Sequence, residues 1–337
     1  MRSLDWVDGA IEMVDQTKLP QVTETLRVET VSDLVAAIKR LSVRGAPALG
    51  VAGAYGVALA ARIHDPKTDR PAFDDAVARI RGARPTAVNL SAMVDRVGPI
   101  AITDPDAALG EAHRIRDEEL EASIRMGELG AELVTELLAE RLAAGRSVRV
   151  MTICNTGGLA AVERGTALSV VQTLHERQQL EEALPVETRP LLQGGRLTTW
   201  ELQRMGAPHR LLVDSAGPFL LARGAADVVL IGADRVAANG DTANKIGSFS
   251  LALGAAHSGV PFIVVAPEST IDMATPSGDA IEIEDRGADE VAAVRGVPVA
   301  PVDTPAVNPA FDVTPVELIT ALVTDTRVVR FDRGETI

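Results

Sequence analysis

DVVLIGADRVAANGDTANKIG, residues 227–247, is the stretch on which the prediction of the fold depends. Val228 to Ile231 form a short run rich in β-branched residues that ends at Gly232, which is typical of a strand buried on both faces. Asp234 follows just past the carboxyl end of this strand, where open α/β sheets bind their ligands. A single loop aspartate more often caps a turn, so its meaning depends on the residues that follow.

The remainder of this stretch adds further polar groups to the same loop. Asn239-Gly240-Asp241 is a turn signal, and Asn244-Lys245 are predicted to open a helix that runs through Leu253. Lys245 is one of four lysines in the chain and the only one in its second half. A carboxylate, an amide and an ammonium in one loop make Lys245 a candidate anion ligand.

The composition is that of a globular protein with 337 residues, enough for two domains. A net charge of −14 argues against a nucleic-acid or anionic-membrane partner, because both require uncompensated Lys and Arg. A phosphorylated small molecule stays possible. Cys154 is the only cysteine, which fits a reducing, cytoplasmic location, and the N-terminus lacks the apolar stretch of a signal peptide. Gly45 to Ala61 is predicted to be a packed core helix rather than a membrane span.

The first part of the chain predicts short strands up to about Thr30 and helices after it. Ser32 is a plausible N-cap, and Pro47 suits the first residue of a helix that ends near Arg62. Free backbone N–H groups at that helix start, together with Arg44, would form an anion site. The alternative is a simple connection between two helices.

A second helical region leads to the other half of the chain. Pro85 interrupts one helix and Thr86 is a candidate start of the next, while Arg84 is either a phosphate contact or a solvated surface residue. Residues 106–142 form a long, partly acidic helical stretch that suits a bridge between domains.

From Ser147 onward, strands and helices alternate, which is the signature of a parallel sheet. The predicted strands, besides the one at 228–231, are Val148 to Ile153, Leu184 to Thr188, Leu211 to Val213, Phe262 to Ala266 and Arg327 to Val329. Cys154 lies at a strand end before a helix predicted to start near Leu159, and a helix N-terminus lowers a thiol pKa. A lone cysteine is more often a small buried hydrophobe. The sequence shows no P-loop, no dinucleotide-binding glycine fingerprint and no metal-ligand spacing of histidines.

Taken together, these loops resemble the methylthioribose-1-phosphate isomerase family, whose superfamily includes the regulatory subunits of translation initiation factor two-B. The matching segments span nearly the whole chain in one order: 44–50 (RGAPALG), 84–90 (RPTAVNL), 154–157 (CNTG), 187–194 (ETRPLLQG), 232–247 (GADRVAANGDTANKIG) and 308–315 (NPAFDVTP).

This resemblance implies an α/β fold in which a smaller, mainly helical N-terminal domain with a short antiparallel sheet precedes a Rossmann-like parallel-sheet domain. The implied divisions are an N-terminal domain over residues 1–115, a long connecting helix over 116–146 and a catalytic domain over 147–337. A homodimer is implied as well.

The resemblance also implies an activity: a cyclic aldose 1-phosphate becomes the open-chain ketose 1-phosphate, as in methionine salvage, without a metal or organic cofactor. Asp234 is implied to be the general acid that protonates the ring oxygen, which requires a pKa raised by a dry, apolar surrounding. Cys154 is implied to assist the transfer of hydrogen from C2 to C1. The implied substrate-binding residues are Arg44, Gly45, Ala46, Arg84, Gln193, Asn244 and Lys245.

Departures from the family pattern concern the substrate more than the chemistry. Ile153 stands where the family usually has histidine, Ser91-Ala92 stand where bulky aromatic residues are common, and the segment that starts at Asp214 is atypical. The 5-substituent of the sugar is therefore open. The alternatives are an isomerase of 5-deoxyribose 1-phosphate or ribose 1,5-bisphosphate, and a non-catalytic protein similar to the initiation-factor subunits.

Overall fold

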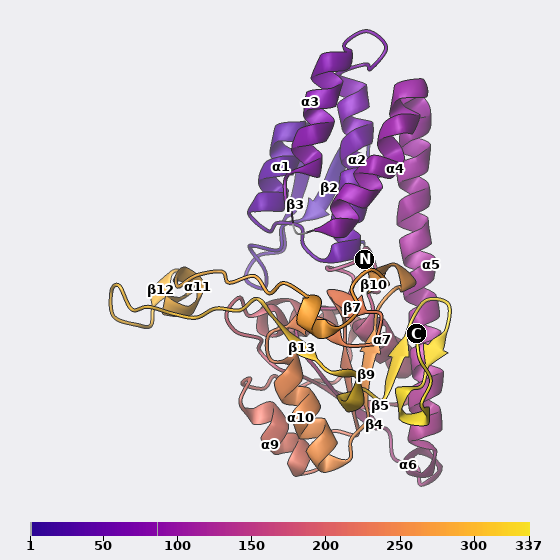
Figure 1. The fold of residues 1–337 in the computed structure, drawn as a ribbon, viewed down its shortest axis with the longest axis vertical. Coiled ribbons are helices and arrows are strands. Elements are labelled where there is room, and N and C mark those ends of the chain that lie inside the picture. Colours follow the sequence, from indigo (N-terminus) through magenta and orange to yellow (C-terminus); the bar gives the residue numbers. More distant parts are fainter. Residues whose placement is uncertain (1, 86) are drawn as a thin grey trace. The chain divides into compact units, whose positions relative to one another are not determined.

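The computed structural model describes every residue except 1 and 86, and the chain divides into two compact units (Figure 1). Unit 1 comprises Met1–Ala122 and Gly157–Gly165, and unit 2 comprises Ser123–Thr156 and Thr166–Ile337. The domain boundaries expected from the sequence, after residues 115 and 146, stay predictions.

Unit 1 combines a small antiparallel sheet, in the order β1-β2-β3, with a group of helices. The elements are β1 (Leu4–Val7), β2 (Ala10–Val14), β3 (Thr25–Val28), α1 (Val31–Lys39), α2 (Ala46–Ile63), α3 (Arg70–Arg81), α4 (Val88–Thr103) and the first part of α5 (Pro105–Leu137). This confirms the prediction that the N-terminal part of the chain is mainly helical and contains a short antiparallel sheet.

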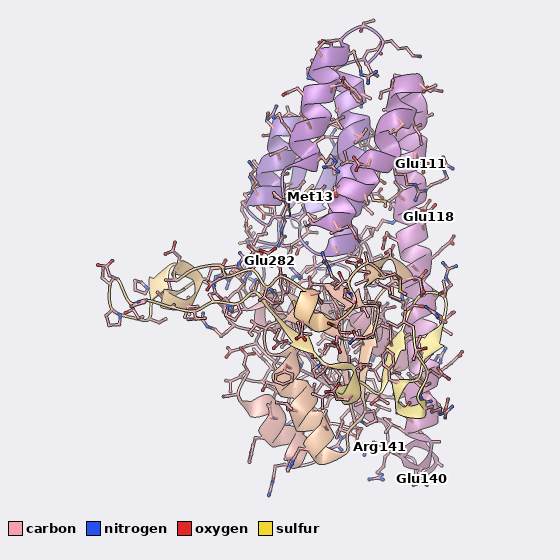
Figure 2. The ribbon with its side chains drawn as sticks, viewed as in Figure 1. Met13, Glu111, Glu118, Glu140, Arg141 and Glu282 are labelled. Carbon is pink, nitrogen blue, oxygen red and sulfur yellow. The ribbon has the colours of Figure 1, made fainter. Side chains whose placement is uncertain are left out.

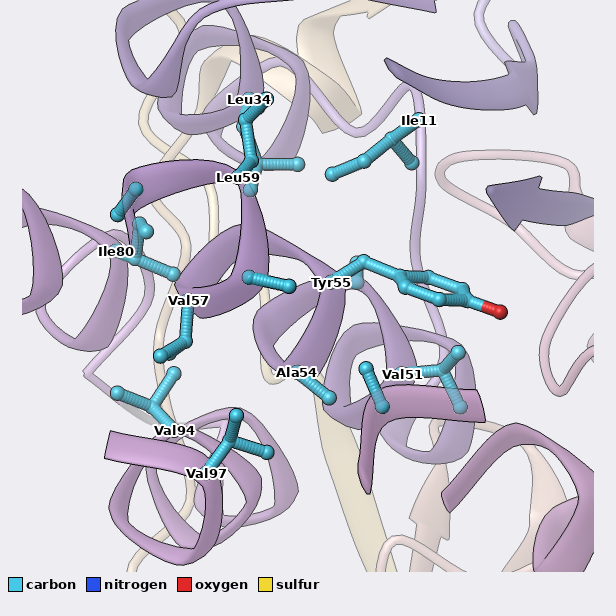
Figure 3. Close-up of a cluster of buried hydrophobic side chains, with 14 of the residues drawn as sticks. Ile11, Leu34, Val51, Ala54, Tyr55, Val57, Leu59, Ile80, Val94 and Val97 are labelled. Carbon is cyan, nitrogen blue, oxygen red and sulfur yellow. The ribbon is translucent and has the colours of Figure 1, made fainter. Parts of the chain in front are cut away.

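Helix α2 forms the centre of the core of unit 1, where side chains from the neighbouring elements surround it (Figure 3). Every residue from Ala48 to Ala61 is buried. Glycines allow its neighbours to approach closely: a Cβ added at Gly53 would lie 2.8 Å from Leu90 Cδ1 of α4, and one added at Gly56 would lie 2.5 Å from Leu34 Cδ2 of α1. Among the described residues, α2 alone is long and apolar enough to cross a membrane, but its burial identifies it as a core helix.

Helix α5 runs through the boundary between the units. In unit 1, Arg96 of α4 forms ion pairs of 2.7 Å with both Glu111 and Glu118 of α5. Figure 2 labels the two glutamates on this helix. In unit 2, the second part of α5 packs closely on α7 (Ala167–Glu176), and a Cβ added at Gly130 would lie 2.4 Å from Val170 Cγ2. The first part of the helix is therefore held by ion pairs and by the burial of Ala108, Ala112 and Ile115 in the core of unit 1, and the second part by close packing on α7.

The core of unit 2 is a mainly parallel sheet in the order β15-β14-β9-β6-β4-β5, in which only the pairing of β14 with β15 is antiparallel. Its strands are β4 (Val148–Thr152), β5 (Leu180–Pro185), β6 (Val228–Ile231), β9 (Phe262–Val265), β14 (Ala321–Val323) and β15 (Val328–Val329). If the five parallel strands are renumbered 1 to 5 in chain order, their order across the sheet, read from β5 to β14, is 2-1-3-4-5. The chain direction across the sheet thus reverses between β4 and β6.

Helices cover this sheet. Leu221 of α9 (Ala216–Ala222) and Leu251 of α10 (Ser248–Ser258) share a buried cluster with Val229 of β6. Successive strand residues point to opposite faces, so Leu230 faces the other side, and it is also completely buried. The predicted burial of residues 228–231 on both faces is confirmed.

Unit 2 contains a second sheet, in the order β10-β7-β8-β13, and its first strand in the chain comes directly after β6. Its strands are β7 (Arg235–Ala237), β8 (Thr242–Lys245), β10 (Ile271–Asp272) and β13 (Phe311–Thr314). Between β10 and β13 an arm with α11 (Asp289–Ala292) and the hairpin β11 (Ala293–Val294) and β12 (Val297–Pro298) extends away from the rest of unit 2 (Figure 1). The other short elements are α6 (Ala139–Ala143), η1 (Gly194–Thr198), α8 (Thr199–Met205), η2 (Glu268–Thr270), η3 (Gly278–Ala280), η4 (Val316–Leu318) and η5 (Phe331–Arg333).

Some predicted element ends are wrong. Thr30, not Ser32, caps α1, because the Thr30 hydroxyl accepts the Asp33 N–H at 3.1 Å. The strand predicted at 184–188 lies instead at Leu180–Pro185, and the chain turns away soon after it, at Thr188, whose φ is +65°. Residues 211–213 form only an isolated bridge, and the helix start predicted at Thr86 lies outside the described residues.

Two helix predictions next to the candidate site are also wrong. Asn244 and Lys245 belong to strand β8, which pairs along β13, and α10 begins only at Ser248. Gly247 lies between β8 and α10 and has a φ of +103°, in the left-handed region that favours glycine. The helix predicted near Leu159 begins instead at Ala167, because residues 157–165 pack in unit 1.

Candidate active site

The site is built at the point where the strand order reverses. Cys154 lies two residues past β4 and Asp234 three residues past β6, and these two strands are neighbours, with Thr152 opposite Leu230. In a sheet of this order, ligands bind beyond the carboxyl ends of the strands at the reversal. The two loops touch, since a Cβ added at Gly232 would lie 2.9 Å from Thr156 Cγ2. The fold therefore brings the two predicted catalytic loops together.

Cys154 has a constrained backbone. Its φ is +63°, in the left-handed region, which costs a residue other than glycine on the order of 1–3 kcal/mol. Two hydroxyl groups hold it there: the Cys154 N–H donates to Thr188 Oγ1 at 2.9 Å, and Thr198 Oγ1 donates to the Cys154 carbonyl at 2.6 Å. The half-buried thiol lies 13 residues before α7, so the helix N-terminus predicted to activate it is absent from this loop.

The segment between these two threonines carries Gln193. Its side chain is only 6% exposed, and its Oε1 makes no hydrogen bond within the described residues, although a buried acceptor without a partner is costly. Next to it, Gly194 opens the π-helical turn η1, where a Cβ would lie 1.8 Å from the Val186 carbonyl oxygen. π-helical turns occur frequently at functional sites. Gln193 thus has an acceptor available for a ligand hydroxyl or amide.

Asn244 and Lys245 lie in β8 beside the strand that the last matched segment forms. Asn244 is buried and donates its Nδ2–H to Ser248 Oγ at 2.8 Å. Lys245 Nζ donates to the Ala310 carbonyl at 2.8 Å and lies 4.3 Å from the centre of the Phe311 ring. A Cβ added at Gly247 would lie 3.0 Å from Ile153 Cδ1, so the end of this segment adjoins the loop of Cys154.

Asp312 caps α10 from the neighbouring strand β13. Its carboxylate accepts the N–H groups of Gly247 at 2.7 Å and Phe249 at 3.1 Å. Burial raises the pKa of Asp312 to about 6, although those two N–H groups and the positive charge of Lys245 favour the ionised form. Asp312 is therefore mostly ionised at neutral pH, with a pKa not far below that pH.

Asp234 is exposed, although its backbone N–H is fixed by the Ala243 carbonyl at 2.9 Å. The sequence leads us to expect a dry, apolar surrounding for a general acid. The residues around Asp234 leave it in contact with solvent, so a substrate would have to exclude that water.

The remaining predicted residues, Arg44, Gly45, Ala46 and Arg84, belong to unit 1. Gly45 precedes α2 with a φ of +95°, and a Cβ there would lie 2.2 Å from the Ala160 carbonyl oxygen. The expectation of free N–H groups at this helix start is wrong in part, because the Ala48 N–H donates to that same oxygen at 3.2 Å and Pro47 has none. The matched segments 44–50 and 84–90 are neighbours, since a Cβ at Gly50 would lie 3.3 Å from the Asn89 carbonyl oxygen.

Two of the departures from the family pattern can be located in the structure. Ile153, in the place of the usual histidine, is buried in the core of unit 2. Ser91 and Ala92 lie in the first turn of α4, where Ser91 Oγ donates to the Val88 carbonyl at 2.9 Å and Ala92 is exposed.

Sequence reasoning assigned no role to Thr188, Thr198, Asp214 or Asp312. Thr188 and Asp312 fall within matched segments, and Asp214 starts a segment that is atypical for the family. These were the available signals, and Thr198 offered none. Within the described part of the chain, no group of three or more His, Cys, Asp or Glu side chains is placed to hold a metal ion.

Comparison with known proteins identifies the family of this chain. The model of the initiation factor 2 subunit family matches residues 42–330. A probable bifunctional methylthioribose-1-phosphate isomerase/methylthioribulose-1-phosphate dehydratase of Nocardia farcinica is 50% identical over 97% of this chain, which spans 59% of that longer protein. A methylthioribose-1-phosphate isomerase of Pelotomaculum thermopropionicum is 44% identical over 96% of this chain and 89% of its own length.

Two solved structures are similar over nearly the whole chain. The 5-methylthioribose 1-phosphate isomerase of Pyrococcus horikoshii has a TM-score of 0.91 at 38% identity, covering 98% of this chain and 92% of its own. A protein described as translation initiation factor eIF-2B, subunit delta, from A. fulgidus has a TM-score of 0.87 at 38% identity, covering 98% and 96%. The chain therefore belongs to the initiation factor 2 subunit family. Its predicted resemblance to the methylthioribose-1-phosphate isomerases of that superfamily is confirmed.

Proposed function

We propose that this protein is a methylthioribose-1-phosphate isomerase, which converts cyclic 5-methylthioribose 1-phosphate to methylthioribulose 1-phosphate in methionine salvage. The observation that carries the proposal is the placement of Cys154 and Asp234 after neighbouring strands, where the order of the sheet reverses. The isomerases that match this chain at 44% to 50% identity support it.

The reaction needs an acid and a path for hydrogen. Phosphate on O1 blocks the easy opening of a free hemiacetal, so Asp234 donates a proton to the ring oxygen as the bond from that oxygen to C1 breaks. Hydrogen then moves from C2 to C1, and the C2 hydroxyl loses its proton to become the ketone. One proton enters at the ring oxygen and one leaves from the C2 hydroxyl, so the charges balance.

Cys154 assists the movement of hydrogen in one of two ways. Its thiolate removes a proton from C2 and an enediol-type intermediate is reprotonated at C1, or it stabilises a direct hydride shift between the two carbons. Substrate with deuterium at C2 distinguishes the routes, because a hydride shift retains the label at C1 and the thiolate route exchanges it with solvent.

Substrate binding is proposed for Gln193, Asn244 and Lys245 of unit 2 and for Arg44, Gly45, Ala46 and Arg84 of unit 1. The buried Gln193 Oε1 has no hydrogen bond from any residue that the structure describes, which supports a bond from a sugar hydroxyl. In unit 2, Lys245 supplies a positive charge that suits a phosphate, and no cofactor is required.

The role of Lys245 is tested by Lys245→Met, which retains the alkyl chain beside Phe311 and removes the charge. A hydrogen bond to a charged group contributes about 1.5–3 kcal/mol, so we expect KM to rise by about 10-fold or more with a smaller change in kcat. Protection of the protein by sulfate against thermal unfolding should weaken in parallel. Lys67→Met, in a polar turn of unit 1, is the matched control; an unchanged KM in Lys245→Met would exclude a role in phosphate binding.

The substrate is tested by measuring kcat/KM for three sugars. Ser91 and Ala92 offer less apolar area than the aromatic residues they replace, and one lost apolar contact reduces discrimination by about 1–3 kcal/mol. We expect methylthioribose 1-phosphate and 5-deoxyribose 1-phosphate to be used comparably. Ribose 1,5-bisphosphate should be poor, because the matched segments supply no second cationic cluster. A clear preference for the bisphosphate would contradict this ranking.

The competing hypothesis is a non-catalytic protein similar to initiation-factor subunits, one of which shares this fold. The presence of Cys154 and Asp234 together with the cationic residues favours the enzyme, since a scaffold requires neither. Absence of turnover with all three sugars would favour the scaffold.

We also propose a cytoplasmic homodimer without nucleic-acid or membrane partners. Helices α9 and α10 pack together and expose Phe219, Phe249 and Leu253, an apolar surface suited to a second copy. Light scattering of the purified protein tests the dimer.

A further inference from the structure

The backbone of Cys154 is fixed by the segment that follows β5. Its N–H donates to Thr188 Oγ1, and its carbonyl accepts from Thr198 Oγ1. Thr188 is completely buried and has a φ of +65°, close to the +63° of Cys154. A β-branched residue rarely adopts this conformation, and such residues concentrate where surrounding contacts impose a functional geometry.

Thr188 is itself held from two sides. Its hydroxyl donates to the Val186 carbonyl at 2.9 Å, so the one hydroxyl hydrogen is used and a lone pair is left to accept the Cys154 N–H. The carboxylate of Asp214 accepts the N–H groups of both Thr188 and Arg189 at 2.7 Å. The direction of the Thr188 hydroxyl is thereby fixed, and with it the position of Cys154.

We propose that Thr188 is a positioning residue for Cys154, and that Asp214 holds Thr188 in the conformation this requires. The inference rests on the proposed function, in which the thiol must lie within reach of C1 and C2. A hydroxyl that both donates and accepts cannot be replaced by a methyl group, since the Cys154 N–H would then lack its partner. Without it, the Cys154 backbone is held in this segment only at its carbonyl, by Thr198, so the Cys154 φ can relax and the thiol moves away from the reacting carbons.

The test compares Thr188→Val, which keeps the shape and removes the hydroxyl, with Thr188→Ser, which keeps the hydroxyl. A displacement of about 1 Å in a reacting group can cost about 100-fold in rate. We expect kcat for methylthioribose 1-phosphate to fall by about 10- to 100-fold in Thr188→Val with little change in KM. Thr188→Ser should stay within a few-fold of the wild-type kcat.

A second readout does not depend on turnover. Cys154 is the only cysteine, so the rate of alkylation by iodoacetamide reports on this thiol alone. We expect the alkylation rate, and its dependence on pH, to change in Thr188→Val and to stay near wild type in Thr188→Ser. Thr173→Val removes another buried hydroxyl of unit 2, one that donates to the Ser169 carbonyl within α7, and should change neither kcat nor alkylation.

A folded Thr188→Val with wild-type kcat and alkylation would overturn the proposal, as would a Thr188→Ser that is equally impaired. If Thr188→Val does not fold, Asp214→Asn, which removes the charge that holds Thr188, is measured in the same two assays. Wild-type values for Asp214→Asn would then overturn the proposal, and reduced kcat with altered alkylation would support it. Failure of the wild-type protein to use any sugar phosphate would refute the proposed isomerase, and alkylation would still decide whether Thr188 positions the thiol.

Discussion

Asp234→Asn is expected to lower kcat by on the order of 10²-fold or more while the protein stays folded. The amide N–H is far too weak an acid to protonate the ring oxygen as its bond to C1 breaks, and a positioned acid contributes about 10²- to 10⁴-fold. Stability should change little, because asparagine has the size of aspartate, the residue is exposed, and the backbone N–H that donates to Ala243 is kept. Steady-state kinetics with methylthioribose 1-phosphate and thermal unfolding measure both effects.

Asp279→Asn, another exposed aspartate of unit 2, is the control for loss of one negative charge. It should have wild-type kinetics. The dependence of kcat on pH adds a second check, because the limb that reports the acid should disappear in Asp234→Asn and remain in Asp279→Asn. A folded Asp234→Asn with near wild-type turnover would exclude the acid role.

Cys154→Ala is the second change with a large expected effect, a decrease in kcat on the order of 10²-fold or more. The thiol acts on the hydrogen that moves from C2 to C1, whichever of the two routes is used, so its loss affects the transition state more than substrate binding. Alanine keeps the backbone N–H that donates to Thr188 and the carbonyl that accepts from Thr198. Circular dichroism should therefore be unchanged and KM nearly so.

Cys154→Ser separates the two routes further. A serine hydroxyl is a far weaker acid than a thiol, so it cannot replace a thiolate base. It remains a polar group beside a hydride shift. Turnover in Cys154→Ser well above that in Cys154→Ala would favour the hydride route, and wild-type turnover in Cys154→Ala would refute any role for the thiol.

The sequence predicts best those features that depend on neighbouring residues. The run from Val228 to Ile231 identifies a strand buried on both faces without reference to the rest of the chain, and Asp234 follows it closely. The placement of Asp234 and Cys154 at adjacent strand ends follows from the same local patterns and the general rule for open sheets.

Features that depend on distant partners could not be predicted in this way. Lys245 has the local sequence of a helix start, but its backbone pairs with Phe311, 66 residues later in the chain, and becomes a strand. The capping of α10 by Asp312 has the same origin. Thr188 acquires its conformation from Asp214, whose segment appears only atypical in the sequence. Tertiary contacts decide these positions, and periodicity does not reveal them.

The discontinuity of unit 1 has a consequence for biosynthesis. Residues 157–165 complete it: the Ser3 N–H donates to the Val162 carbonyl at 2.7 Å, and Gln16 Nε2 donates to the Leu159 carbonyl at 2.7 Å. Val162 is also part of its buried core. The N-terminal helices therefore cannot finish folding on the ribosome until residue 165 has left the exit tunnel, by which time strand β4 and the cysteine loop have been translated as well.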